Sequence, residues 1–341
     1  MVFGTTNGEI LGWNGLNYDN ERVSLVKKIV RARFDALLRG EMIADDLKVF
    51  VKQEPHKIKK IQEGRLRLIS AVSLVDTMID RILFGWLGRK VLDTAGRTPC
   101  LVGWSPVRGG WIQLNDRFRG IPVVCIDKEA WDWTVPEYLV KMWKTFLVAL
   151  PTDSAPWWEK MVDARLDLLF KEPMFQFEDG TRVKQETVGI MKSGCYLTII
   201  LNSLSQSMLH YLTNARLGLP MAENQPYTIG DDTVQESFPQ LREYVDEMEK
   251  LGPVLKGAKV QHFVEFAGFA FDGKTCWPAY WQKHLFNMAH AEYLSETLRS
   301  YQYLYVHEPV MYEFVVRVAR EVDPDSVLPR MVALDIMDNS V

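Results

Sequence analysis

Two neighbouring aspartates follow a glycine in the segment PYTIGDDTVQE, which spans residues 226–236. Strand-forming residues flank Gly230, Asp231 and Asp232, so the segment predicts a β-hairpin with its carboxylates at the turn. Side-by-side carboxylates supply the hard oxygen ligands that Mg²⁺ and Mn²⁺ prefer. The tripeptide alone is too short to distinguish a metal site from an acidic surface turn.

A second pair of aspartates lies in CIDKEAWDW, five residues apart. The apolar run IPVVCID predicts a buried strand that ends at Asp127, and Asp132 follows in the next segment. If this strand lies beside the hairpin, Asp127, Asp231 and Asp232 meet at one point. Two divalent ions held there could activate a hydroxyl and stabilise a leaving pyrophosphate. The alternative is a strand that leaves the core into a charged turn.

The segment SGCYLTIILN begins with Ser193 and Gly194 and continues into a predicted long helix that ends near Gly218. Thr198 and Asn202 are four residues apart, so they share one helix face. Small polar groups on such a face can recognise a ribose hydroxyl. A serine N-cap followed by solvated polar residues is the alternative interpretation.

The basic stretch VKQEPHKIKKIQEGRLRLI carries six Lys or Arg between Lys52 and Arg67, against two glutamates. Its end, RLRLI, alternates basic and apolar residues, which predicts a strand with Arg65 and Arg67 on one side. Together with Lys60, these residues could neutralise a triphosphate. A solvated basic loop is the alternative.

The overall charge hides an asymmetry along the chain. The 341 residues carry a net charge of −4, but residues 1–120 hold 20 basic and 13 acidic residues, a net charge of +7. A basic first third on an acidic body can hold phosphates on one side and cations on the other. The four cysteines are widely scattered without zinc-ligand spacing, which indicates a reducing compartment and no structural zinc.

Helices and strands are predicted without a regular β–α alternation, which favours the α+β class. No apolar run is long enough to span a bilayer, and we expect no signal peptide. Helices are predicted over residues 21–39, 70–92, most of 136–170, 194–217, 240–252 and the tail from 277, and strands or hairpins over 47–55, 121–127, 174–187, 226–236 and 262–271.

Taken in order, these segments resemble the conserved motifs of viral RNA-dependent RNA polymerases over roughly residues 20–290. The basic stretch is similar to motif F, DKEAWD to motif A, SGCYLTIILN to motif B and GDD to motif C. The acidic helix with LGPVLKGAKV resembles motif D, and FVEFAGFAF through WPAYWQKH resembles motif E. The sequence is most similar to the sobemovirus, polerovirus and barnavirus group of positive-strand RNA viruses.

The resemblance implies a right-hand polymerase fold with an antiparallel-sheet palm, mixed fingers and a small helical thumb. It assigns residues 1–120 to the fingers, 121–135 to the palm, 136–185 to a fingers insertion, 186–276 to the palm and 277–341 to a reduced thumb. The implied activity is template-directed RNA synthesis from NTPs, which replicates and transcribes a viral RNA genome.

The resemblance also implies a role for each motif residue. Asp127 and Asp231 would bind two Mg²⁺ or Mn²⁺ ions, with Asp232 assisting. A motif D lysine would protonate the leaving pyrophosphate, and Lys259 is preferred over Lys256. The expected NTP-binding residues are Lys52, Lys60, Arg65 and Arg67 for the triphosphate and Asp132, Ser193, Thr198 and Asn202 for the ribose.

The implied partners are the RNA template, the nascent RNA and NTPs, together with a protein primer (VPg) and other viral replication proteins. The expected location is the host cytoplasm, in membrane-associated replication complexes. Two other functions are considered. A reverse transcriptase usually carries an aromatic gate where this chain has Asp132. A non-catalytic RNA-binding protein would explain the basic residues, but not three carboxylates on strands.

Overall fold

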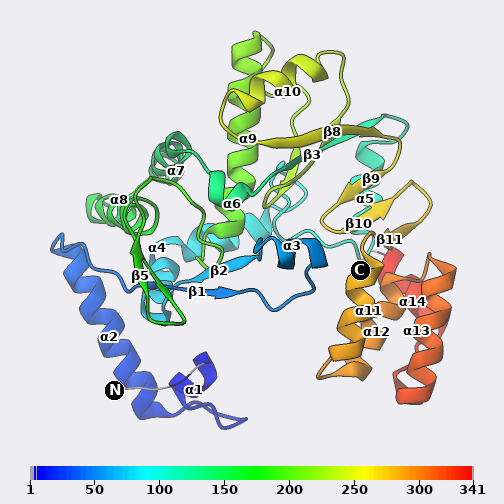
Figure 1. Ribbon diagram of the computed structural model, residues 1–341, viewed down its shortest axis with the longest axis horizontal. Helices are drawn as coiled ribbons and strands as arrows, with labels where there is room; N and C mark the ends of the chain where they lie inside the picture. Colours follow the sequence, from blue (N-terminus) through cyan, green and yellow to red (C-terminus); the bar gives the residue numbers. More distant parts are fainter. Residues whose placement is uncertain (1–3, 5, 340–341) are drawn as a thin grey trace. The chain divides into compact units, whose positions relative to one another are not determined.

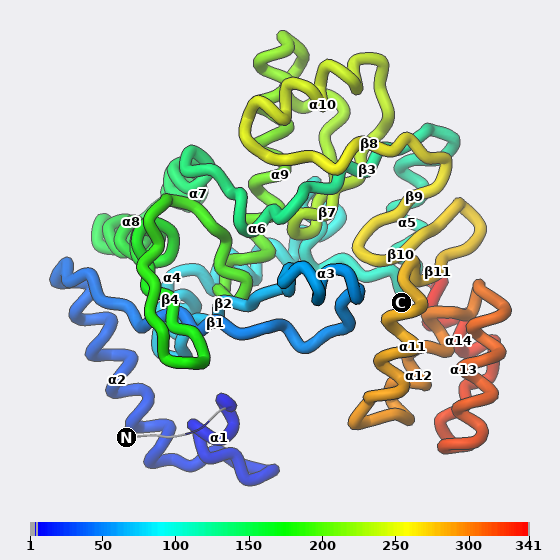
Figure 2. The backbone as a smooth tube through the Cα atoms, viewed as in Figure 1, coloured from blue at the N-terminus to red at the C-terminus, as the bar shows by residue number. Residues whose placement is uncertain are grey.

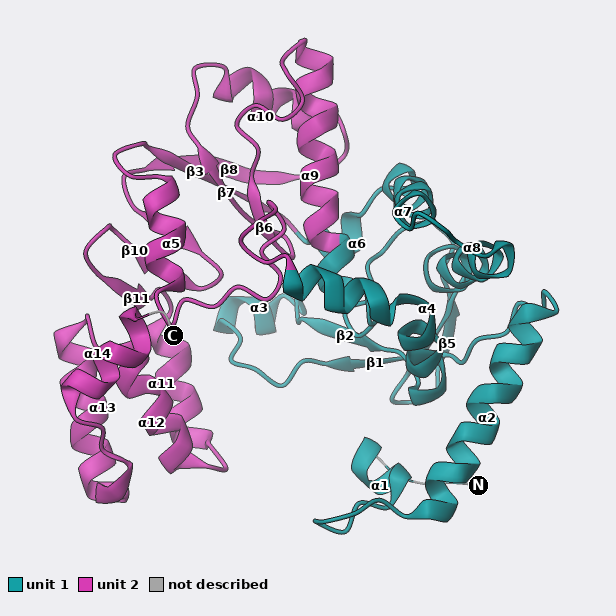
Figure 3. Cartoon of the chain, turned by 180° about the vertical axis from the view of Figure 1, so that it is seen from behind, with its two compact units in different colours: residues 1–93, 130–201 teal, residues 94–129, 202–341 magenta. Residues whose placement is uncertain are grey.

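The computed structural model describes residue 4 and residues 6–339, and it divides the chain into two compact units. Unit 1 comprises residues 1–93 and 130–201, and unit 2 comprises residues 94–129 and 202–341 (Figure 3). Each unit contains its own β-sheet and helices without regular alternation. The α+β class predicted from the sequence is therefore confirmed.

Unit 1 is built on a four-stranded sheet of order β2-β1-β4-β5. The first strand pairs antiparallel with β2 and parallel with β4, and Figure 2 shows the chain passing through α3 between β1 and β2. The predicted hairpin around Asp179 and Gly180 is present as β4–β5. The bounds are β1 Leu47–Val51, β2 Leu68–Ala71, β4 Met174–Phe177 and β5 Arg182–Lys184.

The long helices of unit 1 follow the predicted periodicity, with one correction, whereas the short helices Asn7–Leu11, Ile58–Gln62 and Trp131–Thr134 were not predicted. The helix expected from residue 70 begins at Leu74, because Ser70 and Ala71 belong to β2 and pair with β1. A buried ion pair between Arg165 and Asp80 joins α8 to α4. The bounds are α1 Asn7–Leu11, α2 Asn20–Leu38, α3 Ile58–Gln62, α4 Leu74–Asp93, α6 Trp131–Thr134, α7 Glu137–Ala149 and α8 Pro156–Phe170.

Unit 2 contains an antiparallel sheet of order β6-β7-β3-β8 and a smaller sheet of order β11-β10-β9. The predicted apolar strand is β3, which pairs with β7 on one side and β8 on the other. Figure 1 shows β3 beside β8. The bounds are β3 Val123–Lys128, β6 Tyr227–Ile229, β7 Asp232–Glu236, β8 Leu255–Gln261, β9 Val264–Phe266, β10 Phe269–Phe271 and β11 Cys276–Pro278.

Helix α9, Thr198–Leu217, begins in unit 1 and continues in unit 2, and it ends at the predicted Gly218, whose φ is +71°. The helical tail predicted from residue 277 begins after β11. Its helices pack around buried residues such as Leu298 and Tyr305. The other helices of unit 2 are α5 Gly110–Arg117, α10 Leu241–Glu249, α11 Trp281–His290, α12 Leu294–Leu304, α13 Pro309–Val322, η1 Pro324–Ser326 and α14 Arg330–Asp338.

The expected fingers, palm and thumb ranges remain a prediction, because the two units do not test them. Residues 1–3, 5, 340 and 341 of those ranges lie outside the described residues. In the described part of the chain, no helix has the length and apolarity that crossing a bilayer requires.

Candidate active site

The three acidic residues of motifs A and C come together in unit 2. Asp127 lies near the end of β3, while Asp231 is in the turn between β6 and β7 and Asp232 begins β7. Strands β3 and β7 pair antiparallel through Val123–Glu236 and Val124–Gln235, and extending that register places Asp232 opposite Asp127. The hairpin and the buried strand are therefore neighbours, as the sequence predicts.

The turn that presents Asp231 is held by a serine that the sequence analysis missed. Gly230 has a φ of +62°, which favours glycine, and its N–H donates to Ser203 Oγ at 2.8 Å. Thr228 Oγ1 also donates to the Ser203 carbonyl, at 3.2 Å. Ser203 is fully buried on α9. In the sequence, only its position directly after Asn202 of motif B could have pointed to Ser203 as a functional residue.

The carboxylates repel one another electrostatically. The pKa of Asp232 is raised to about 6, first by burial and then by the charges of Asp231, Asp127 and Glu265, while Lys128 opposes the shift. A pKa raised by neighbouring like charges shows that the site concentrates negative charge. Glu265 is a member of this environment that the sequence analysis did not identify.

Two lysines of unit 2 lie among these charges. Lys256 Nζ is 2.9 Å from Asp127 Oδ2. Lys128 is almost completely buried, and burial lowers its pKa to about 8 against the opposing charges of the three aspartates. Lys259, the preferred motif D residue, pairs through its backbone with Cys125 and forms no ion pair with the described residues. The structure thus brings Lys256, rather than Lys259, to a motif aspartate.

The carboxylates of Asp127, Asp231 and Asp232 are of a type that binds divalent metals, although their oxygens are not arranged around one point as metal ligands would be. No group of three or more His, Cys, Asp or Glu in residue 4 and residues 6–339 is positioned to hold a metal ion. Carboxylate oxygens are the ligands Mg²⁺ and Mn²⁺ take, and the raised pKa of Asp232 reports negative charge that a cation would stabilise. The residues therefore fit the expected metals in chemistry and charge.

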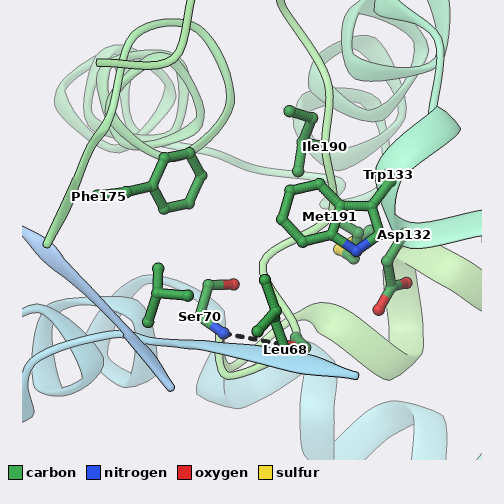
Figure 4. A pocket seen from close by; sticks show the side chains of 9 residues that line it. Leu68, Ser70, Asp132, Trp133, Phe175, Ile190 and Met191 are labelled. Atoms are coloured by element: carbon green, nitrogen blue, oxygen red, sulfur yellow. Dashed lines mark hydrogen bonds between the residues drawn. The ribbon is translucent and has the colours of Figure 1, made fainter. Parts of the chain in front are cut away.

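Unit 1 places two of the expected ribose-binding residues around one small pocket. Asp132 in α6 and Ser193 both line it, as do Trp133 and Ile190 (Figure 4). The pocket has a volume of about 20 Å³, which admits about one water molecule. Ser193 Oγ accepts the N–H of Ser70 at 3.1 Å, so the hydroxyl proton is the group that Ser193 can offer to a ligand.

The other two expected ribose-binding residues lie on α9. Thr198 Oγ1 is 2.6 Å from the Lys192 carbonyl and 2.8 Å from the Cys195 carbonyl, so it supports the turn that precedes the helix. Asn202 is buried in unit 2, and its carbonyl accepts from Gln206 Nε2 at 3.3 Å. The hydroxyl of Thr198 therefore contacts backbone carbonyls of the turn that contains Ser193, which is consistent with a role in supporting that turn.

The basic residues of motif F lie in unit 1 and are exposed. Strand β2 begins at Leu68, so the prediction that Arg65 and Arg67 lie on one face of a strand is wrong. Each arginine instead pairs with a glutamate, Arg65 with Glu63 and Arg67 with Glu54 at 2.8 Å.

Two lysines complete the expected phosphate-binding set. Lys52 follows β1 and lies 3.0 Å from Glu54, whereas Lys60 belongs to the short helix α3. Burial raises the pKa of Glu54, but Lys52 and Arg67 outweigh that effect and lower it overall. Lys52, Arg65 and Arg67 therefore already have glutamate partners, which a triphosphate would have to replace.

Comparisons with known proteins agree with this arrangement. A family model described as viral RNA-dependent RNA polymerase matches residues 44–262. The chain is 30% identical over 280 residues to the replicase polyprotein P2AB of Southern bean mosaic virus, which covers 77% of this chain and 26% of the polyprotein. It is 27% identical over 214 residues to the RNA-directed RNA polymerase of mushroom bacilliform virus, covering 60% and 50% of the two chains.

A solved structure gives the same fold. The Sicinivirus 3Dpol RNA-dependent RNA polymerase superposes with a TM-score of 0.69 at 18% identity, covering 95% of this chain and 71% of that one. This similarity confirms the right-hand polymerase fold predicted from the sequence. The chain spans about a quarter of the length of the Southern bean mosaic virus polyprotein. The chain belongs to the family of viral RNA-dependent RNA polymerases.

Proposed function

We propose that this chain catalyses template-directed RNA synthesis from NTPs, and that it replicates and transcribes a viral RNA genome. The observation that carries the proposal is the position of Asp127 beside the Asp231–Asp232 hairpin on one antiparallel sheet. Asp127 and Asp231 would hold two Mg²⁺ or Mn²⁺ ions, and Asp232 would assist. Bound there, the ions would lower the pKa of the RNA 3′-hydroxyl and stabilise the charge of the leaving pyrophosphate.

The protein's own groups bind and orient the nucleotide. Lys52, Lys60, Arg65 and Arg67 bind the triphosphate, and for this Lys52, Arg65 and Arg67 exchange their glutamate partners for phosphate oxygens. Asp132, Ser193 and Asn202 recognise the 2′-hydroxyl of the ribose, and Thr198 supports the turn that carries Ser193.

A lysine of β8 donates a proton to the pyrophosphate. The ion pair with Asp127 favours Lys256 for this role, whereas Lys259 is the prediction from the sequence. The test that separates them compares single Lys→Met substitutions at the two positions, as described in the Discussion.

The partners follow from the same activity. The chain binds an RNA template, the nascent RNA and NTPs. Because its relatives include replicase polyproteins, we propose that it works with other viral replication proteins, including a protein primer (VPg). The proposed location is the host cytoplasm, in membrane-associated replication complexes.

Extension of a primed RNA template with labelled NTPs and dNTPs, with and without Mg²⁺ or Mn²⁺, tests this function. The proposal expects metal-dependent extension that prefers NTPs. Efficient use of dNTPs would instead support a reverse transcriptase, in which the 2′-hydroxyl is not required. RNA binding without extension in either metal would support a passive RNA-binding protein.

A further inference from the structure

Lys192, directly before Ser193, is a buried lysine that the proposed chemistry does not use. Its side chain is completely buried in unit 1. Its Nζ donates to Gln185 Oε1 at 2.7 Å, to the Gly189 carbonyl at 3.2 Å and to the Ile190 carbonyl. An ammonium group has three N–H donors, so these three oxygens match its full hydrogen-bonding capacity.

Two aromatic rings and two acidic groups complete the surroundings of this lysine. Its Nζ lies 5.3 Å from the centre of the Phe170 ring and 5.4 Å from that of Phe175. Burial lowers the pKa of Lys192 to about 7, against the opposing charges of Cys195 and Asp132. Such a desolvated lysine is costly for the fold unless its contacts are all made.

The segment that Lys192 holds is tightly constrained. Gly189 has a φ of +123°, and a Cβ there would lie 2.2 Å from the Val135 carbonyl oxygen. Ile190 has a φ of +51°, a strained conformation for a β-branched residue. The next residue, Met191, donates its N–H to the Asp132 carbonyl at 2.6 Å. The bonds of Lys192 therefore fix a strained segment that ends on the backbone of Asp132.

The backbone of Lys192 fixes the other side of the same pocket. Its carbonyl accepts the Cys195 N–H at 2.9 Å and the Thr198 hydroxyl at 2.6 Å, which closes the turn containing Ser193. Ser193 Oγ in turn accepts the Ser70 N–H, the bond marked by the dashed line in Figure 4. One residue thus joins the segment that holds Asp132 to the turn that presents Ser193.

We propose that Lys192 is a positioning residue for sugar recognition, which fixes Asp132 relative to Ser193 at the pocket in unit 1. This inference rests on the proposed function, because it assigns Asp132 and Ser193 to the 2′-hydroxyl. Sugar recognition depends on the placement of these two groups, so a shift of their backbone weakens it even when both side chains are intact.

The direct test is Lys192→Met, which keeps an unbranched chain of similar length without the charge or the three donors. The ratio of kcat/KM for an NTP to that for its dNTP is expected to fall about tenfold, the effect of weakening one charged hydrogen bond. Lys184→Met is the matched control, because the side chain of that lysine is exposed in β5 and forms an ion pair with Glu172. Its ratio is expected to match the wild type.

A second pair of variants separates positioning from stability. Gln185→Met removes one of the three oxygens to which Lys192 Nζ donates, and Gln185 is not among the residues that line the pocket, so the ratio of kcat/KM for NTP to that for dNTP is expected to fall in this variant as well. Trp158→Phe loses the buried bond from Trp158 Nε1 to the Leu83 carbonyl, and it lowers the Tm through the same unit without touching the pocket. Its ratio is expected to stay at the wild-type value.

The outcomes are distinguishable from those that test the proposed function. If the wild-type chain extends RNA and prefers NTPs, an unchanged ratio in folded Lys192→Met contradicts the positioning role alone. If Lys192→Met does not fold, an unchanged ratio in Gln185→Met contradicts the positioning role. The positioning role would also be overturned if the NTP-to-dNTP ratio of kcat/KM fell as much in Trp158→Phe as in Lys192→Met. A wild-type chain that does not distinguish NTP from dNTP overturns the proposed sugar recognition and this inference with it.

Discussion

Lys256 Nζ lies 2.9 Å from Asp127 Oδ2, so a cation from β8 meets the carboxylate near the end of β3. Both side chains are about half exposed or more, and water screens such pairs until they add little to stability. The contact therefore matters for chemistry rather than for folding. It places an ammonium group beside a proposed metal ligand, where the pyrophosphate would leave.

Lys256→Met is expected to lower kcat for nucleotide addition about 100-fold, because a positioned general acid contributes about that much or more. Lys259→Met is the matched control on the same strand and is expected to change kcat far less. Single-nucleotide extension under saturating NTP measures both. An equal or larger loss in Lys259→Met would return the motif D role to the residue that the sequence analysis preferred.

Ser203→Ala is expected to destabilise the chain and to weaken catalysis together. The substitution leaves the Gly230 N–H without its acceptor, which costs about 1–3 kcal/mol for a buried group. Thermal unfolding and primer extension measure the two effects, and Ser300→Ala on α12 serves as the control. Loss of stability with unchanged extension would mean that the turn presents Asp231 without help from Ser203.

Asp132→Ala is expected to narrow the preference for NTPs over dNTPs by about tenfold or more, as the loss of a charged hydrogen bond predicts. Asp153→Ala, which removes an exposed aspartate of the same unit, is the control. Parallel kcat/KM measurements for an NTP and its dNTP give the ratio. If Asp132→Ala keeps the wild-type ratio, Asp132 does not read the sugar.

Arg67→Ala is expected to raise the KM for NTP or lower kcat by more than it weakens RNA binding, because a triphosphate ligand acts in the nucleotide step. Arg182→Ala removes another exposed, ion-paired arginine of unit 1 and is the control. Steady-state extension and RNA-binding titrations provide the comparison. A larger effect on RNA affinity than on the NTP parameters would assign Arg67 to the template instead.

The sequence predicts most of the elements that carry motif residues, because their signals are local. The run ending at Asp127 forms β3, the residues around Gly230 form a hairpin, and Gly218 ends α9. Hydrophobic alternation and turn chemistry act over a few residues, which is why these elements can be read directly. The prediction of a strand at Arg65 and Arg67 is wrong because alternation does not fix where a strand begins: Gly64 has a φ of +66°, and β2 begins only at Leu68.

The supporting residues could not be predicted in the same way. Ser203, Lys128 and Lys192 owe their roles to burial and to partners on other elements. Serine and lysine residues are far more often exposed than buried, so the residue type does not indicate a buried supporting role. The motif D lysine is identified by which side chain of β8 contacts Asp127 on β3, and the spacing of Lys256 and Lys259 in the sequence does not determine this.

Primer extension by Asp231→Ala tests the central claim most directly. With Mg²⁺ or Mn²⁺ present, the account predicts a loss of at least about 1,000-fold in kcat, since metal binding supplies several kcal/mol of transition-state stabilisation. It also predicts a Tm without metal that is equal to or above that of the wild type, because the substitution removes a repelling charge from Asp232. Extension at the wild-type rate by a folded Asp231→Ala chain would contradict the assignment of Asp127 and Asp231 as the metal-binding pair.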